Sequence, residues 1–209
     1  HHAVLDAVNW LVAHEGACVE WIPATVAGEI DVDWLEDYLA NHSADVALCA
    51  VMWANNETGV IQPVEAVARL CDDAGIAFHS DGVQAAAWLA PETPWRAGRS
   101  SLAISAHKFG GPVGVGALVA SGVTPTPLLH GGGQEIDVRS GTVATALAAS
   151  MAAALDETAD RRDDEFERVT HLVAQLERSV LSVVPDALFV GERSARLPNI
   201  RAVTFPDCQ

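Results

Sequence analysis

Lys108 is the only lysine in a chain that contains twelve lysine and arginine residues. A desolvated lysine amine can act as a nucleophile and form a Schiff base with an aldehyde, whereas a guanidinium stays protonated. The lysine follows an apolar run at residues 102–104 and precedes Gly110-Gly111, as at a strand that passes into a tight turn. This position favours a chemical role for Lys108. The alternative is that a composition rich in arginine retains few lysines by drift.

Three polar loops follow consecutive predicted strands. They are residues 55–57 (Asn-Asn-Glu), 79–84 (His-Ser-Asp-Gly-Val-Gln) and 105–108 (Ser-Ala-His-Lys). Because the carboxyl ends of parallel strands open onto one crevice, we expect an acidic residue, an amide pair and the lysine to meet there. A structural ion pair between a carboxylate and the lysine is the simpler alternative. It does not explain the Ser/His pair that precedes the lysine.

Helices and strands alternate along the part of the chain that must position these loops. Periodicity and capping predict helices at residues 3–14, after Asp31, and from Pro63 to Ala74. Strands are predicted at residues 18–22, 46–53, 76–81, 102–104 and 114–120. The alternation predicts an α/β fold, with three α/β/α layers and a mostly parallel sheet that helices cover on both faces.

The character of the chain changes near residue 145. From residue 142 to about residue 184 the sequence is nearly free of helix breakers, and its charged part, residues 156–168, indicates a solvated helix face. Two more strands are predicted at residues 187–190 and 200–205. We therefore expect residues 1–145 to form a large domain. Residues 146–209 would form a long connecting helix and the start of a smaller α+β domain.

Composition excludes several classes of function. Half of the 209 residues are hydrophobic, which is enough for a substantial core. The net charge of −16 opposes nucleic-acid binding, and no apolar run approaches the length of a membrane span, so we expect neither partner. The first residues lack a signal-peptide layout, which predicts a cytoplasmic protein. The four cysteines include no Cys-x-x-Cys pair and indicate neither a metal site nor a disulfide framework.

Five motifs, in this order, resemble those of the cysteine desulfurases, which belong to the fold-type I pyridoxal-phosphate enzymes of the class V aminotransferase superfamily. The motifs are residues 54–59 (Ala-Asn-Asn-Glu-Thr-Gly), 79–84, 105–108, 130–135 (His-Gly-Gly-Gly-Gln-Glu) and 139–142 (Arg-Ser-Gly-Thr). The resemblance covers essentially the whole chain, which lacks both ends of the family pattern. It implies pyridoxal 5′-phosphate as the cofactor.

Five residues would contact the cofactor ring if the resemblance holds. Lys108 would form the Schiff base, and Asp81 would pair with the pyridine nitrogen and keep it protonated, so that the ring acts as an electron sink. Asn56 and Gln84 would bind the phenolate oxygen. His1 would stack on the ring, and a tag remnant is the alternative for this residue.

Three residues would hold the cofactor phosphate. The resemblance assigns Ser105 and His107 to the phosphate of their own subunit. It assigns Thr142 to the phosphate of a neighbouring subunit, which makes a homodimer part of the site. The sequence departs from the family pattern at Ser80, Gly82 and Val83.

The resemblance implies an enzyme that converts L-cysteine to L-alanine and passes the sulfur, as an enzyme persulfide, to an acceptor such as an iron–sulfur scaffold protein. In the family pattern the persulfide cysteine and the arginine that binds the substrate carboxylate lie beyond Gln209, so we expect this chain alone to be inactive. Selenocysteine lyase and class V aminotransferase are the alternative enzymes. The alternative from another class is a non-catalytic interaction module whose acidic surface binds a basic partner.

Overall fold

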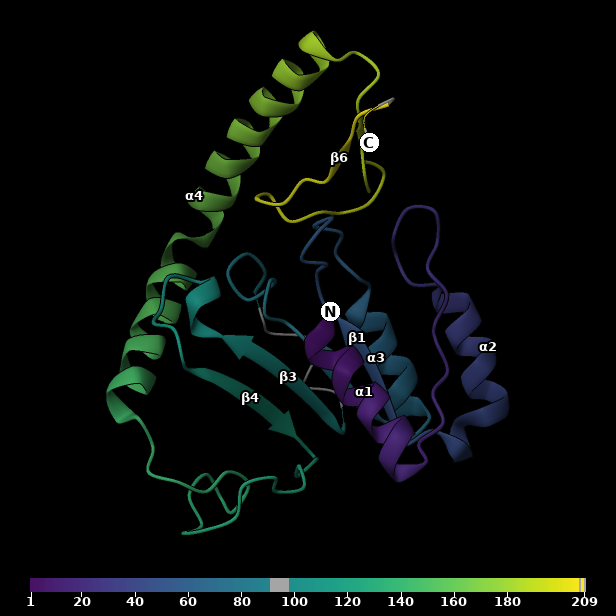
Figure 1. The fold of residues 1–209 in the computed structure, drawn as a ribbon, viewed down its shortest axis with the longest axis vertical. Helices are drawn as coiled ribbons and strands as arrows, with labels where there is room; N and C mark the ends of the chain where they lie inside the picture. The colour runs from purple at the N-terminus through teal and green to yellow at the C-terminus, as the bar shows by residue number, and fades with distance from the viewer. Residues whose placement is uncertain (91–97, 207, 209) are drawn as a thin grey trace.

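The computed structural model describes residues 1–90, 98–206 and 208 (Figure 1). A four-stranded sheet in the order β1-β2-β3-β4 forms its centre. The strands are β1 (Leu48–Met52), β2 (Ala77–Asp81), β3 (Ser100–Ser105) and β4 (Gly116–Ser121). The first three are parallel, and β4 runs antiparallel to β3. The predicted α/β class with a mostly parallel sheet is confirmed.

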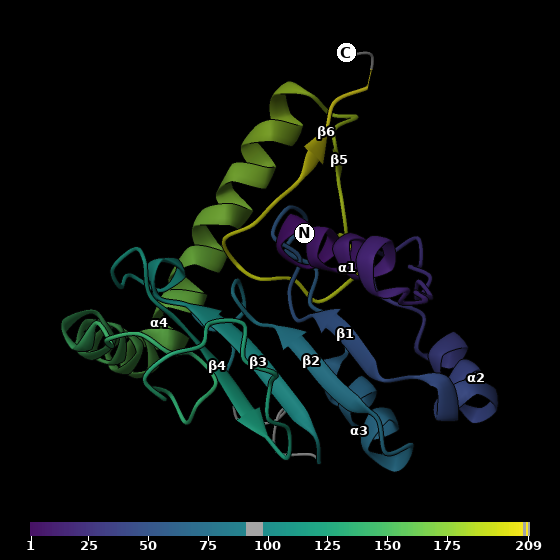
Figure 2. The same cartoon turned by 60° about the horizontal axis from the view of Figure 1, so that its bottom comes forward.

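Helices cover both faces of this sheet. α1 (His2–Glu15) lies over one face and α3 (Val64–Asp73) over the other, while α2 (Val32–His42) lies beyond the β1 edge (Figure 2). A short 3-10 helix, η1 (Ser43–Asp45), follows α2. The N-cap of α2 is Asp31, whose carboxylate accepts the Trp34 N–H at 2.9 Å, as its position predicts.

The two faces of the sheet have different roles. Side chains that alternate along the strands, among them Val51, Phe78 and Leu102, are buried in the main core with α3. His79 and Asp81 lie at the intervening positions of β2 and line a cavity under α1. The α3 face therefore supplies the core, and the α1 face presents the polar residues.

One predicted strand, residues 18–22, is wrong. The segment has no regular secondary structure, and its Trp21 side chain is 57% exposed. An extended segment becomes a strand where a neighbour satisfies its backbone N–H and C=O groups. Among the described residues, no strand or isolated bridge pairs with residues 18–22.

The long predicted helix and the last two predicted strands are confirmed. α4 (Thr145–Val183) runs for 39 residues past β4 to a small antiparallel sheet of β5 (Leu188–Phe189) and β6 (Val203–Thr204) (Figure 1). Thr158 Oγ1 lies 2.7 Å from the Ala154 carbonyl of its own helix and 3.1 Å from the Phe109 carbonyl, so α4 contacts the turn after β3 at this residue. The domain boundary at residue 145 stays a prediction, although α4 begins there.

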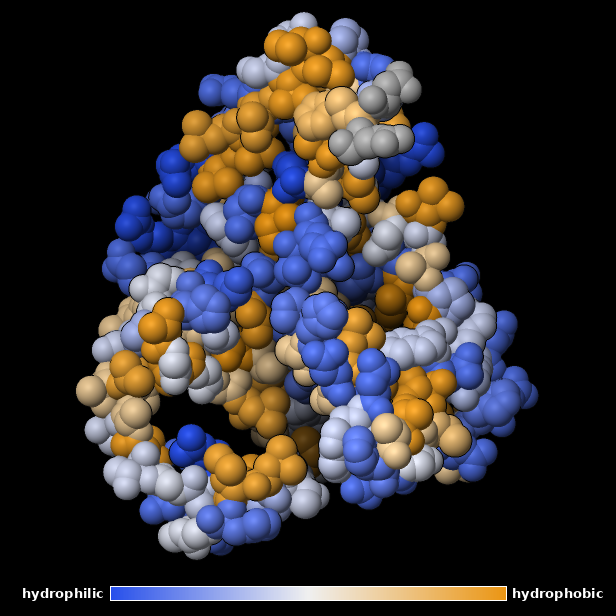
Figure 3. Space-filling model, viewed as in Figure 1, coloured by the Kyte–Doolittle hydropathy of each residue, from blue (hydrophilic) through white to orange (hydrophobic). Residues whose placement is uncertain are grey.

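Apolar side chains remain exposed around the end of α4 and the β5–β6 sheet (Figure 3). Leu172, Leu176 and Leu188 are each at least half exposed. Contiguous exposed apolar surface is typical of sites that contact protein, membrane or ligand. Within the described parts of the chain, no helix is both long and apolar enough to cross a membrane.

Candidate active site

The carboxyl ends of β1, β2 and β3 form one edge of the sheet. Asp81, the last residue of β2, pairs in register with Met52, the last residue of β1, and with Ala103 of β3. The loops that carry Asn56 and Lys108 begin just beyond these strands. The structure therefore brings the three predicted loops to the same edge.

Lys108 ends a short 3-10 helix, η2 (Ala106–Lys108), directly after β3. The Phe109 and Gly111 N–H groups both donate to the Ala106 carbonyl, at 3.1 and 2.9 Å, which closes a tight turn. A Cβ at Gly111 would lie 2.9 Å from the Ala106 Cβ, so the turn requires glycine there. The Lys108 side chain is exposed, and no ion pair between described residues involves it. This finding disfavours a purely structural ion pair.

Ser105 and His107 form a pair immediately before the lysine. Ser105 Oγ and His107 Nδ1 are 2.9 Å apart, and the tautomer of the histidine decides which of them donates. A hydroxyl and an imidazole side by side can both donate to phosphate oxygens. This pair is therefore a suitable donor set for an anion.

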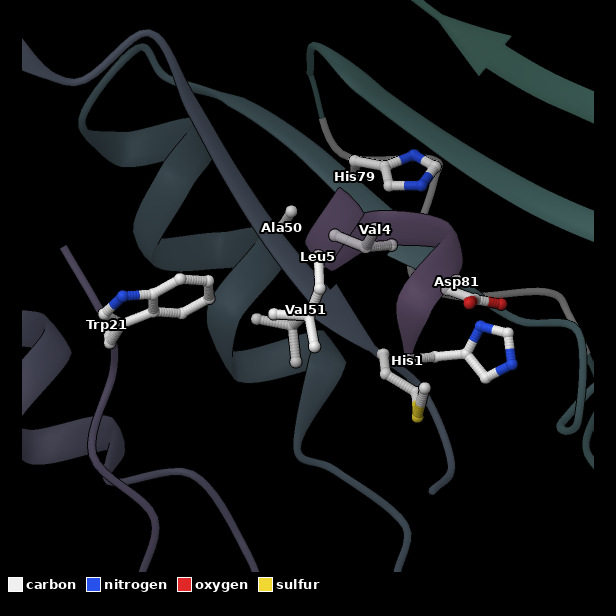
Figure 4. A pocket seen from close by; sticks show the side chains of 9 residues that line it. His1, Val4, Leu5, Trp21, Ala50, Val51, His79 and Asp81 are labelled. Atoms are coloured by element: carbon white, nitrogen blue, oxygen red, sulfur yellow. The ribbon is translucent and has the colours of Figure 1, made fainter. Parts of the chain in front are cut away.

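The carboxylate of Asp81 lies on a cavity of about 150 Å³ under α1 (Figure 4). His1 and His79 line the same cavity. His1 is also the N-cap of α1, because its Nδ1 accepts the Ala3 N–H at 3.1 Å. The structure therefore brings His1 close to Asp81, as the resemblance implies, and reveals a capping role that sequence reasoning missed.

His79 is a site neighbour to which sequence reasoning gave no role. Its Nδ1 is 2.9 Å from Ser101 Oγ on the adjacent strand. Burial lowers the pKa of His79, and the nearby Asp81 carboxylate partly opposes this effect. The signal was present in the sequence: in a strand, residues two apart, such as His79 and Asp81, share one face.

The two adjacent asparagines have different positions in their loop. The Asn55 side chain accepts the N–H groups of Glu57 and Thr58, both at 2.9 Å, and so closes the loop on itself. Asn56, the next residue, is half-buried. Asn55 is thus the structural member of the pair, which leaves Asn56 as the candidate for binding.

Gln84 is half-buried in the turn that follows β2. Asp81 shapes this turn, because its Oδ1 accepts the Val83 N–H at 3.0 Å. Ser80 points away from the site and is buried, and its hydroxyl has no hydrogen-bond partner among the described residues. Ser80, which departs from the family pattern, is therefore a residue of the core and not of the site.

Thr142 is exposed and belongs to the segment between β4 and α4, which lies beyond the carboxyl end of β4 (Figure 1). Because β4 is antiparallel, its last residue, Ser121, pairs with Ser100 at the start of β3. The loop that follows β4 therefore leaves from the amino end of the parallel strands. The structure does not bring Thr142 to the other predicted residues within one chain.

The fold and the site define an α/β protein with a lysine-centred site at the carboxyl edge of a parallel sheet. A family model described as aminotransferase class-V matches residues 1–209. The chain belongs to this family.

Named relatives support the same assignment. The chain is 43% identical to an IscS-like cysteine desulfurase of Mycobacterium tuberculosis, over 100% of this chain and 53% of that protein. It is 40% identical to the cysteine desulfurase NifS of Azotobacter vinelandii, over 98% of this chain and 50% of that protein. A NifS-like protein from Rickettsia africae superposes with a TM-score of 0.88 at 29% identity, over 100% and 56% of the two chains. The chain thus spans about half the length of its curated relatives.

Class-V aminotransferases use pyridoxal phosphate, and the residues at this edge fit that cofactor. The cofactor needs an amine for its aldehyde, a carboxylate for its ring nitrogen and donors for its phosphate. Lys108, Asp81 and the Ser105–His107 pair supply these groups from neighbouring strand ends. The chemistry of the donor set therefore agrees with the family.

Proposed function

We propose that this chain provides the cofactor site of a cysteine desulfurase, which removes sulfur from L-cysteine, leaves L-alanine and passes the sulfur to an acceptor protein. The observation that carries the proposal is the convergence of Lys108, Asp81 and the Ser105–His107 pair at one sheet edge. The identity of 43% to an IscS-like cysteine desulfurase supports the choice of reaction. When bound, the cofactor supplies an electron sink for the carbanion at the substrate Cα.

The residues on the α1 face would hold the ring and manage protons. The Lys108 amine would hold the cofactor aldehyde and, once the substrate amine has displaced it, would be free to move protons at the substrate Cα. Asp81 would hold a proton on the ring nitrogen, and its hydrogen bond from the Val83 N–H fixes its position. His1, which also caps α1, would cover the ring, while Asn56 and Gln84 would donate to the phenolate oxygen.

The phosphate would be held by two chains. Ser105 and His107 donate from the chain that carries the lysine. Thr142 belongs to the segment that follows β4 and leaves from the amino end of the parallel strands, so we propose that it donates to the phosphate of a second copy. The active enzyme is then a homodimer whose sites are completed in trans.

The acceptor we propose is a protein that receives persulfide sulfur, such as an iron–sulfur scaffold. Its surface is basic where it meets this chain, because the chain carries a net charge of −16. We place the enzyme in the cytoplasm. We propose that the enzyme binds neither nucleic acid nor membrane.

The test uses the full-length protein supplied with pyridoxal phosphate. We expect a visible absorption band that borohydride bleaches, a pyridoxyl adduct on Lys108 by mass spectrometry, and alanine from L-cysteine, with sulfide released when added dithiothreitol reduces the persulfide. Lys108→Ala is the control and loses all three. An adduct on another residue contradicts the site assignment.

Two further outcomes separate the alternatives. Activity on selenocysteine but not on cysteine identifies a selenocysteine lyase, and amino transfer to a keto acid identifies an aminotransferase. A full-length protein that takes up no cofactor contradicts the enzyme proposal and favours the interaction module.

A further inference from the structure

The segment between β5 and β6 is paired with the loop that carries Asn56 (Figure 1). Two backbone hydrogen bonds join them: Ile61 N–H donates to Ala195 O at 2.8 Å, and Leu197 N–H donates to Gly59 O at 2.8 Å. We call residues 195–197 the latch. It connects the end of the chain to the edge that carries the candidate active site.

The loop of Asn56 is a hairpin whose outer strand is held by the latch. Asn55 N–H donates to Val60 O at 2.9 Å, which joins the two arms of the hairpin. The antiparallel bridge between Val60 and Arg196 adds the latch on the other side. Residues 59–61 are thus the middle strand of three, and Asn56 lies in the turn at their end.

Gly59 lies so close to the Ile200 backbone that no residue with a side chain fits at position 59. Gly59 has a φ of +77°, and a Cβ on it would lie 2.9 Å from the Ile200 carbonyl oxygen. Leu197 is fully buried in the main core. A displacement of the latch therefore acts directly on the backbone beside Asn56.

Glu177 of α4 holds the latch through two arginines. Its Oε1 accepts from Arg201 Nε at 2.7 Å and from Arg196 Nη2 at 3.4 Å. Arg201 Nη1 also donates to the carbonyls of Leu197 and Ile200, both at 2.7 Å. One carboxylate on α4 thus organises two guanidiniums, and one of these binds the latch backbone.

Glu177, Arg196 and Arg201 are largely shielded from water, so water screens the interactions between their charges only weakly. Exposure is 11% for the Arg196 side chain, 14% for Arg201 and 25% for Glu177. Burial and then the charge of Arg201 lower the pKa of Arg196, and the carboxylates of Glu177 and Glu192 oppose this effect. Loss of the carboxylate would leave two neighbouring cations without their shared anion.

We propose that Glu177 is a positioning residue for Asn56: by holding Arg196 and Arg201 together it keeps the latch paired with the Asn56 loop. The role in the cofactor site rests on the proposed function, in which Asn56 donates to the cofactor. Glu177 acts through the latch and touches no reacting atom. The proposal couples the long helix α4 to the geometry of the cofactor site.

The first experiment needs no cofactor. We would measure amide hydrogen exchange in the full-length apo protein with Glu177→Gln, which keeps the side-chain shape and removes its charge. We expect the Ile61 and Leu197 amides to exchange about tenfold faster or more. The Phe78 amide, bonded to Arg99 O at 2.8 Å, reports on the sheet and should not change.

The matched control is Glu157→Gln on the same helix. Glu157 also pairs with an arginine, Arg161, at 3.4 Å, but its side chain is 70% exposed. Glu157→Gln should leave the exchange rates of the Ile61 and Leu197 amides unchanged. If Glu177→Gln does not fold, Arg196→Gln replaces it, because this variant keeps the Glu177–Arg201 pair and should give a smaller effect in the same direction.

The second experiment measures the pH midpoint of the visible absorption band in the loaded enzyme. Glu177→Gln should move this midpoint in the same direction as Asn56→Ala. The double variant should have the same midpoint as Asn56→Ala alone. The proposal is overturned if Glu177→Gln lowers the melting temperature but changes neither the exchange rates of the Ile61 and Leu197 amides nor the pH midpoint. A wild-type protein that takes up no cofactor overturns the proposed function and with it the role of Asn56, whatever the exchange data show.

Discussion

Gly82 and Leu102 fit together at the start of the turn that follows Asp81. A Cβ at Gly82 would lie 2.6 Å from Leu102 Cδ1 on the neighbouring strand. The glycine is one of the departures from the family pattern, and the fully buried Leu102 explains it. Leu102 therefore leaves no room for a side chain at position 82.

Gly82→Ala should therefore destabilise the protein by about 1–3 kcal/mol, because the added methyl group overpacks a closed site. Leu102→Val removes the atom that would clash. In the Leu102→Val background, Gly82→Ala should cost clearly less than it does alone. Urea denaturation of the four proteins measures this coupling, and strictly additive effects would contradict the contact.

This relationship shows where sequence reasoning succeeds and where it stops. The order of helices and strands followed from local periodicity, and so did the sharing of one edge by Asp81 and Lys108. Nothing local in residues 114–120 distinguishes a parallel strand from the antiparallel β4. Residues 18–22 have strand character, but a strand also needs a partner, and the described chain places none beside them.

The roles of individual residues that depend on tertiary contacts could not be predicted from the sequence. Residue type and spacing do not separate Asn55 from Asn56: the choice of Asn56 came from the resemblance, and the loop-closing role of Asn55 came from the structure. The contacts of Glu177 with Arg196 and Arg201 join residues about 20 positions apart and leave no periodic signal. Such roles depend on tertiary contacts, which composition and spacing do not encode.

Ser80→Ala should raise the free energy of unfolding by about 1 kcal/mol. The Ser80 hydroxyl is buried and has no hydrogen-bond partner among the described residues, so the folded state bears its desolvation cost. Ser101→Ala is the matched control, because Ser101 Oγ does have a partner, His79 Nδ1 at 2.9 Å, and its loss should destabilise. Equal losses of stability in both variants would show that Ser80 has a partner in solution.

The stability of the protein should rise with pH where His79 titrates. Burial lowers the pKa of His79 in the folded state from its usual 6.5, so the unfolded state binds the proton more tightly. The contribution is complete above about pH 6.5 and is lost as the pH falls toward the lowered folded-state pKa. His79→Gln should flatten this part of the curve of unfolding free energy against pH.

The control for this prediction is His171→Gln, which changes an exposed histidine on α4. It should leave the slope of the curve unchanged. A slope that survives His79→Gln would assign the pH dependence to another group.

The placement of Thr142 predicts a specific outcome for mixed dimers. Thr142→Ala alone should weaken cofactor binding by about ten- to hundredfold, because one hydrogen bond to a charged phosphate is lost. Heterodimers of one Thr142→Ala chain and one Lys108→Ala chain would be purified through two different tags. If Thr142 acts in trans, the site with Lys108 receives Thr142 from its partner and binds one cofactor per dimer with wild-type affinity.

The alternative gives a different titration. If Thr142 acted within its own chain, the one lysine-bearing site would lack the threonine and bind as weakly as in the Thr142→Ala homodimer. Because the two cases predict the same stoichiometry, the affinity of the single site decides between them. A fully active monomer would exclude the trans arrangement, because its site would then be complete without a second copy.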